Sequence, residues 1–217
     1  DVCSSDLTYS ALWKQAKDAQ QKDLPQTEQE VLGQIVTKAE REQAYGHLLK
    51  AGLQRAKSQC EVAPDSLKPA VEQLKERAAQ AEGNHVLQAV YYAVLGYIYY
   101  HNSWLDEQRH EEIGQDYYDK AMAYPDELAA VKATDYDPFV VKGEHSRYFG
   151  DDLLSLIGIP AGHARQLRDY YLKAGNRHGA LFASESMLLN EEPDDVEQEP
   201  LNKSKHIQRL DSLIAEY

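Results

Sequence analysis

Apolar residues recur at intervals of three and four along most of the chain, which is the spacing of amphipathic α-helices. A clear example is the stripe Val31, Leu32, Ile35, Val36 and Ala39. It follows a proline at position 25, and proline favours the first turn of a helix. No pair of alternating apolar segments is joined by a hairpin signal such as Asn-Gly. The pattern therefore predicts an all-α fold.

The predicted helices are similar in length and are separated by short breaks. We expect them around residues 12–19, 25–39, 45–60, 64–78, 86–104, 106–124, 153–157, 161–174 and 176–189. Residues 135–138 are expected to form a loop, and residues 139–143 a short extended segment. Helices of similar size joined by short loops are typical of stacked helical hairpins. The specific prediction is an irregular tetratricopeptide-like array of antiparallel hairpins, an α-solenoid.

One predicted hairpin matches the tetratricopeptide pattern in part. Leu167, Tyr171, Gly175, Ala180 and Met187 fall where that repeat has Leu, Tyr, Gly, Ala and a further small or apolar residue. Glycine at position 175 permits a tight turn between helices. Alanine at position 180 allows the two helices to pack closely.

The chain divides into four segments by composition. Residues 1–7 equal the in-frame translation of a common sequencing-adapter oligonucleotide, so we expect an assembly artefact there. A lipid-carrying cysteine at position 3 is the rival interpretation, which Asp1 fits poorly. Residues 8–190 are the predicted helical-repeat domain, and residues 191–200 are an acidic, proline-containing linker. Residues 201–217 are expected to begin a further helix that is truncated.

Charge and composition exclude several classes of function. The chain has 36 acidic and 23 basic residues, giving a formal net charge of −13. Nucleic-acid binding gains affinity by neutralising phosphates, so an acidic chain without a basic patch is not expected to bind nucleic acid. No apolar run approaches the roughly 20 residues of a membrane-spanning helix. The two cysteines, Cys3 and Cys60, form neither a disulfide framework nor a zinc site.

Motifs with catalytic chemistry are weak in this sequence. Two Glu-x-x-His pairs, Glu82/His85 and Glu107/His110, resemble half of a di-iron site in a helical bundle. The first pair spans Gly83 and Asn84, which break a helix, so solvated helix ends explain both pairs better. The sequence contains no phosphate-binding glycine loop and no nucleophile elbow. We therefore predict no catalytic residue, no metal ligand, no cofactor and no enzymatic activity.

Tyrosine is unusually frequent, with fifteen tyrosines against three phenylalanines. Most occur in doublets, at positions 91–92, 99–100, 117–118 and 170–171. A groove that presents aromatic rings to a peptide would use one member of each doublet, and the candidates are Tyr92, Tyr99, Tyr118 and Tyr171. The alternative, which we favour, is that one ring of each doublet packs between helices while its hydroxyl reaches the surface.

Four groups of short segments resemble the helical N-terminal region of the large alpha-2-macroglobulin family proteins of Bacteroidetes. They are Leu12-Trp13-Lys14-Gln15 with Lys22 to Thr27; Leu48 to Ala51 with Pro64 to Leu67; Pro138-Phe139-Val140 with Gly143, Ser146, Tyr148-Phe149 and Asp151 to Leu154; and Tyr170 to Arg177. The resemblance spans roughly residues 9–190.

This resemblance implies an exported protein of the periplasm or cell envelope, with tandem β-sandwich domains downstream. The covalent thioester motif of the family, Cys-x-Glu-Gln, is absent, because Cys60 is followed by Glu61, Val62 and Ala63. The function implied is a non-catalytic scaffold or interaction region, whose partners are other domains of the same chain or an envelope protein. The alternative is a stand-alone helical-repeat adaptor that binds a peptide or protein in a tyrosine-lined groove.

Overall fold

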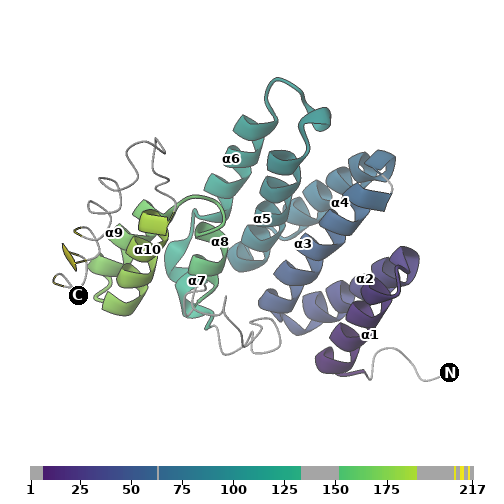
Figure 1. The fold of residues 1–217 in the computed structure, drawn as a ribbon, viewed down its shortest axis with the longest axis horizontal. Helices are drawn as coiled ribbons and strands as arrows, with labels where there is room; N and C mark the ends of the chain where they lie inside the picture. The colour runs from purple at the N-terminus through teal and green to yellow at the C-terminus, as the bar shows by residue number, and fades with distance from the viewer. Residues whose placement is uncertain are drawn as a thin grey trace.

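The computed structural model describes residues 7–62, 64–132 and 152–189, together with positions 208, 211, 212 and 215. Regular structure within these residues is helical, which confirms the all-α class (Figure 1). Within the described residues, β-type pairing occurs as an isolated antiparallel bridge between Lys132 and Asp152.

Ten α-helices and two short 3-10 helices are described. The α-helices are α1 (Tyr9–Gln21), α2 (Pro25–Glu42), α3 (Tyr45–Val62), α4 (Leu67–Gln80), α5 (His85–His101), α6 (His110–Ala121), α7 (Pro125–Ala130), α8 (Leu153–Gly158), α9 (Ala164–Lys173) and α10 (Arg177–Leu189). The 3-10 helices are η2 (Pro64–Ser66) and η3 (Ser103–Leu105).

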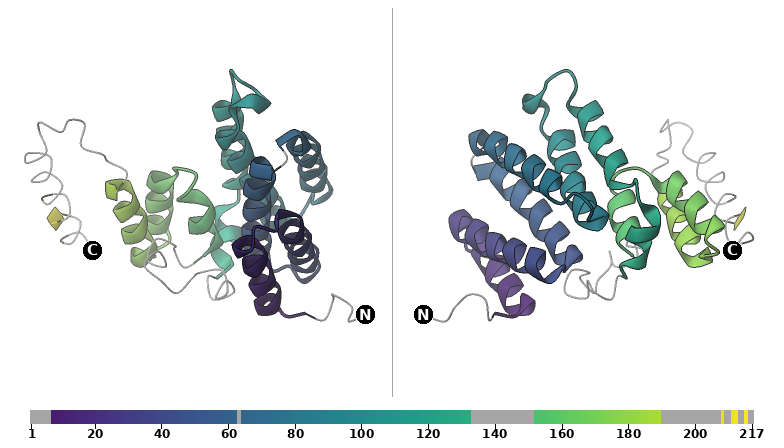
Figure 2. Two further views of the ribbon diagram at one scale, coloured as in Figure 1. Left: turned by 45° about the vertical axis from the view of Figure 1, so that its right-hand side comes forward. Right: turned by 180° about the vertical axis from the view of Figure 1, so that it is seen from behind.

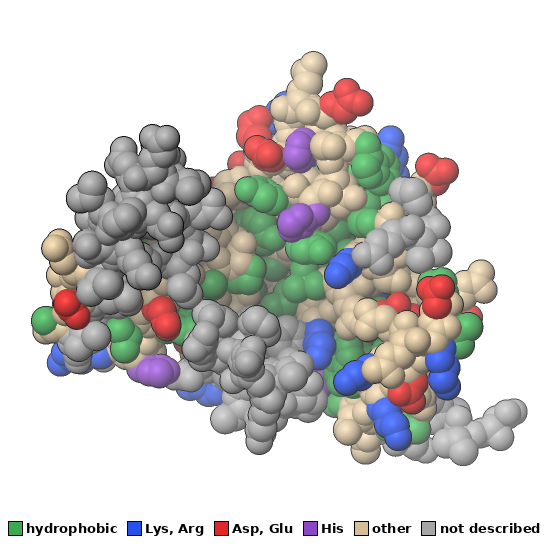
Figure 3. Space-filling view, viewed as in Figure 1, with side chains coloured by type: hydrophobic (Ala, Val, Ile, Leu, Met, Phe, Trp, Pro, Cys, Tyr) green, Lys and Arg blue, Asp and Glu red, His purple; other side chains and the backbone are tan. Residues whose placement is uncertain are grey.

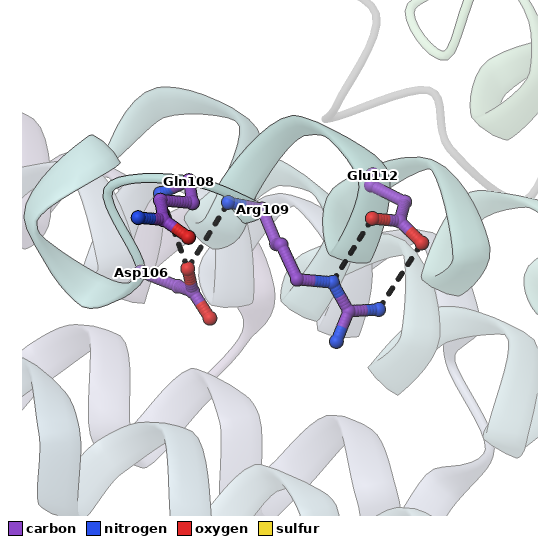
Figure 4. Close-up of polar contacts among 4 residues, drawn as sticks. All are labelled: Asp106, Gln108, Arg109 and Glu112. Carbon is purple, nitrogen blue, oxygen red and sulfur yellow. Dashed lines mark hydrogen bonds and ion pairs between the residues drawn. The ribbon is translucent and has the colours of Figure 1, made fainter.

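The helix boundaries differ from prediction mainly between α5 and α6. Asn102 caps α5 by donating from Nδ2 to the carbonyl oxygen of Ile98 at 2.7 Å. The carboxylate of Asp106 then accepts from the backbone N–H groups of Gln108 at 3.2 Å and Arg109 at 3.0 Å (Figure 4). Such a side-chain turn competes with helix formation. Helix α6 therefore begins at His110, four residues later than the pattern predicts.

Helix α7 is an element that the sequence analysis missed. Pro125 occupies its first turn, where the missing N–H group costs nothing. The ring also disfavours helical backbone at the preceding residue, Tyr124, so α6 cannot continue into α7. The predicted helix over residues 106–124 is thus a shorter helix, and a separate short helix follows it.

The helices run across the molecule from α1 at one side to α9 and α10 at the other (Figures 1 and 2). Helix α1 packs on α2, α2 on α3, α5 on α6, and α9 on α10. Hydrophobic side chains gather in the middle of the face in Figure 3, with acidic and basic side chains around them. Helix α5 is the central element, because it contacts α3, α4, α6 and α7.

Two glycines bring α5 and α6 into close contact. A Cβ atom at Gly114 would lie 3.0 Å from the backbone nitrogen of Tyr100 and 3.1 Å from the carbonyl oxygen of Gly96. A Cβ atom at Gly96 would lie 2.9 Å from the ring of Tyr118. The two backbones therefore approach as closely as they do only because both positions lack a side chain.

Helices α9 and α10 form the hairpin predicted from the tetratricopeptide-like residues. Leu167, Tyr171 and Ala180 are buried in it. Gly175 lies in the connecting turn with φ +71°, a left-handed conformation that glycine adopts without strain. The closest approach involves Gly179, where a Cβ atom would lie 2.8 Å from the ring of Tyr171.

Several predictions concern residues outside the described part of the chain. The loop at 135–138, the extended segment at 139–143 and the acidic linker at 191–200 all lie outside it. The same holds for residues 1–6 and for most of the final helix expected after position 201. Of the four groups of segments that resemble the macroglobulin family, the third also falls there, except for Asp152 to Leu154.

Candidate functional site

A groove of about 280 Å³ lies between α3 and α4, above α5. Both α3 and α4 pack on α5, but they make few contacts with each other. The space between them is the groove, and its floor is apolar. The floor is formed by Leu48 and Ala56 of α3, and by Val90, Val94 and Ile98 of α5. These five side chains are at most 4% exposed, so the surface that the groove offers to solvent comes from residues of α3 and α4 at its rim, such as Arg55, Pro69 and Ala70.

Two arginines line this groove, Arg55 of α3 and Arg77 of α4. The guanidinium group of Arg77 forms an ion pair with Glu40 of α2. The hydroxyl group of Tyr91, on α5, donates to the same Glu40 carboxylate at 2.7 Å. Burial and this contact with Glu40 raise the pKa of Tyr91. Glu40 therefore links α2 to α4 and α5 beside the groove.

Arg55 has a different environment from that of Arg77. Its Nε donates to the Gln29 side-chain oxygen at 3.3 Å, and the Gln29 amide donates to the Arg55 carbonyl oxygen at 3.0 Å. Partial burial of the guanidinium group and the nearby positive charge of Arg77 lower the pKa of Arg55, while Glu40 opposes this effect. The two arginines thus bring positive charge to the groove lining of an otherwise acidic protein.

Other residues of the groove lining carry neutral polar groups. Gln59 of α3 donates from Nε2 to the Ser66 side-chain oxygen at 2.8 Å and to the Ser66 carbonyl oxygen at 3.1 Å. Pro69 and Gln73 of α4 are exposed at the rim. The groove lining therefore combines two arginines, neutral polar groups and buried apolar residues.

Two of the predicted partner-binding tyrosines, Tyr92 and Tyr99, are half-buried on α5. Tyr117 of α6 stacks against both, with ring centroids 6.0 Å from Tyr92 and 5.7 Å from Tyr99. The Lys75 ammonium lies 5.7 Å from the Tyr99 ring centre, and that of Lys120 lies 5.1 Å from the Tyr117 ring centre. These contacts form a tyrosine row that bridges α5 and α6.

The other two predicted tyrosines, Tyr118 and Tyr171, lie in the interior. Their side chains are 7% and 2% exposed, so neither ring is presented to a partner in this structure. Burial raises the pKa of Tyr118 to about 12. The Tyr171 hydroxyl donates to the buried Asp152 carboxylate at 2.6 Å. The third surface ring of the row is Tyr117 instead of Tyr118.

In three doublets one ring packs in the interior as the alternative predicts, but the Tyr171 hydroxyl bonds the buried Asp152 instead of reaching the surface. Each of the pairs at 91–92, 117–118 and 170–171 has one buried and one half-buried ring. None of the four predicted tyrosines lines the groove. Tyr91 is the one tyrosine among its lining residues. The signal that the sequence analysis missed is a set of small and long polar residues that line the groove from α3 and α4: Arg55, Ala56, Ala70 and Arg77.

The Glu-x-x-His pairs do not form a shared site. His85 Nδ1 lies 2.6 Å from a Glu127 carboxylate oxygen, and its ring stacks on Tyr124 with centroids 3.6 Å apart. Glu107 is exposed in the turn before α6. Within the described ranges, no group of three or more His, Cys, Asp or Glu side chains is arranged to hold a metal ion.

Comparison with protein-family models, with curated proteins and with solved structures found no match. Among the described helices, none has both the length and the apolar composition needed to cross a bilayer. The geometry of the groove is therefore the main support for a functional proposal.

Proposed function

We propose that this chain is a non-catalytic interaction module, an irregular tetratricopeptide-like solenoid that binds a segment of a partner protein between α3 and α4. The main support is the groove, whose lining combines apolar residues with polar and charged groups. Recognition sites commonly combine an apolar surface with a few placed polar groups that fix orientation. Helical repeats also use such concave surfaces to bind extended segments.

The resemblance to the macroglobulin family supports a specific setting for this module. In that setting the chain is a scaffold region of a large exported protein in the periplasm or cell envelope. Its partner is then another domain of the same protein or an envelope protein. Deletion of residues 8–190 from the full-length protein should abolish this docking. Unchanged folding, localisation and partner binding after the deletion would argue against the setting but not against the groove.

A groove-filling substitution tests the module directly. Ala70 lines the groove from α4, whereas Ala79 on the same helix is exposed and lies outside it. Ala70→Phe places a ring in the groove, and Ala79→Phe is the matched control. The probe is a synthetic library of fluorescein-labelled octapeptides, half with free and half with amidated C-termini, measured by fluorescence anisotropy.

The proposal predicts that peptides enriched on the wild-type chain bind it saturably. They should bind Ala79→Phe equally well and Ala70→Phe at least tenfold more weakly. If the library contains no saturable binder, or if Ala70→Phe binds as tightly as the control, the groove is not the partner site.

A further inference from the structure

We infer that the tip of the α5–α6 hairpin is a docking surface for an arginine-rich segment of a partner protein. The tip consists of residues 100–112, which are the end of α5, η3, the turn after it and the start of α6. It projects beyond the ends of the neighbouring helices (Figures 1 and 2). None of its residues lines the groove between α3 and α4, so this inference does not depend on the function proposed above.

Two aromatic side chains are exposed at the tip. Tyr100 is 48% exposed and Trp104 is 38% exposed. Trp104 keeps this exposure although the Lys68 ammonium of α4 lies 5.7 Å from the centre of its ring, a contact in which the ring already accepts a cation. Tyrosine, tryptophan and arginine are enriched where proteins bind one another. The tip therefore offers two rings of the kind that anchor a partner.

Hydrogen bonds fix the shape of the tip. Asn102 donates to the carbonyl oxygen of Ile98 at 2.7 Å, and Asp106 accepts from two backbone N–H groups of the following turn (Figure 4). His110 Nδ1 lies 3.3 Å from the carbonyl oxygen of Tyr99, which joins the start of α6 to the end of α5. An ordered turn presents its side chains without the entropic cost of ordering a loop on binding.

The charge of the tip selects a basic partner. Residues 100–112 contain four acidic side chains and one arginine. That arginine, Arg109, already pairs through Nε and Nη2 with the two carboxylate oxygens of Glu112, at 3.0 and 3.1 Å (Figure 4). Glu107 and Glu111 are exposed, and neither forms an ion pair with another described residue. Two carboxylates are thus left for a cationic partner.

Arginine fits this combination better than lysine does. A planar guanidinium group stacks on aromatic rings and binds carboxylates through paired hydrogen bonds, whereas an ammonium group is a compact, strongly hydrated charge. The occupant is therefore an arginine-rich segment, whose guanidinium groups lie on Tyr100 and Trp104 and pair with Glu107 and Glu111.

The test uses three fluorescein-labelled decapeptides that differ only in four side chains. They carry four arginines, four lysines or four glutamates at the same positions of a Gly-Ser background. Binding is measured by fluorescence anisotropy to the wild-type chain and to two double variants. The variant Tyr100→Ala/Trp104→Ala removes the rings, and Glu107→Gln/Glu111→Gln removes the carboxylates.

Two further double variants are the matched controls. Leu24→Ala/Leu172→Ala removes two exposed apolar side chains elsewhere, which are 47% and 44% exposed. Glu30→Gln/Glu76→Gln removes two exposed carboxylates on α2 and α4 and changes the net charge by the same amount as the tip variant. A circular dichroism melt of each variant separates loss of folding from loss of recognition.

The wild-type chain should bind the arginine peptide at least fivefold more tightly than the lysine peptide, and should not bind the glutamate peptide saturably. The variant without the rings should lose the preference for arginine over lysine. The variant without the carboxylates should bind both basic peptides at least tenfold more weakly. Both control variants should bind as the wild-type chain does.

Three outcomes would overturn the inference. Equal binding of the arginine and lysine peptides by the wild-type chain refutes the contact with the rings. An equal loss of binding in Glu30→Gln/Glu76→Gln shows attraction to the overall negative charge instead of the tip. Tighter binding of spermine than of the arginine peptide refutes a protein segment as the occupant. Each of these results leaves the proposal for the groove unaffected.

Discussion

Helix α5 packs against α3 and α4, which make few contacts with each other. It also packs against α6, whose backbone it approaches directly. Gly96 and Gly114 remove the side chains that would separate α5 from α6. Between α3 and α4, by contrast, direct contacts are few, and a groove remains that the small residues Ala56 and Ala70 line in part. Small residues thus close one interface and leave the other open, according to what faces them.

The largest effect is expected from removing the ring that fills the closed interface. Tyr118→Ala should lower the free energy of unfolding by about 4 kcal/mol, because a buried aromatic side chain leaves a cavity. Tyr100→Ala is the control, since that ring is 48% exposed and its loss should cost less than about 1 kcal/mol. Chemical denaturation of both variants measures the difference. Similar losses would show that the α5–α6 interface is not tightly packed.

A smaller effect is expected from adding one methyl group to the same interface. Gly114→Ala should destabilise the protein by about 2 kcal/mol, because the added Cβ meets the α5 backbone. Gly33→Ala on α2 is the opposite case: its added Cβ has only Arg55 Cζ near it, at 4.0 Å. That change should stabilise the protein by roughly 0.5–1 kcal/mol through helix propensity. A stabilising Gly114→Ala would contradict the close contact.

Acidification should weaken the contact between α1 and α3, the helix that forms one side of the groove. His47 is 4% exposed, its ring stacks on Tyr9, and its Nδ1 accepts a hydrogen bond from Trp13 Nε1 at 3.0 Å. Burial, and secondarily the charge of Lys50, lowers the pKa of His47 from 6.5 to about 4. The folded state therefore binds fewer protons than the unfolded state between these values, so stability falls as the pH drops from 6.5 towards 4.

The loss assigned to His47 should be between about 1 and 2 kcal/mol once solvent screening is allowed for. His47→Gln retains an acceptor for Trp13 but does not titrate. Denaturation of both proteins at pH 7 and pH 4.5 isolates the contribution, because the other acid-titrating groups are shared. An equal pH dependence in the two proteins would exclude His47 as its source.

The smallest stability effect is expected in the groove itself. Ala70→Phe should change the free energy of unfolding by less than about 1 kcal/mol, because the ring enters open space rather than a packed core. Ala79→Phe should behave alike, and thermal melts compare the two. A much larger loss for Ala70→Phe would mean that α4 cannot accommodate the ring and that the groove is narrower than described.

The helices were predictable where an apolar stripe and a terminal signal agreed. Pro25 marks the start of α2, and Gly175 marks the turn before α10, because each residue has a backbone preference that acts locally. Helix α7 was missed because its six residues are too few to show an apolar stripe. Pro125, directly after the predicted helix over 106–124, is the local signal that marks its start.

The candidate site was less predictable than the fold. The sequence indicates that one ring of a tyrosine doublet is buried, but not which one, because neighbouring helix positions differ by only 100° around the axis. Tyr117 rather than Tyr118 therefore joins the surface row. The groove depends on the spacing of α3 and α4 on α5, which no short-range pattern encodes.

The dissociation constants of groove-selected peptides for Ala70→Phe and Ala79→Phe test the central claim most directly. The account predicts that the Ala79→Phe value equals that of the wild-type chain and that the Ala70→Phe value is at least tenfold higher. Equal affinities in the two variants, with both proteins folded, would contradict the assignment of the groove as the partner site.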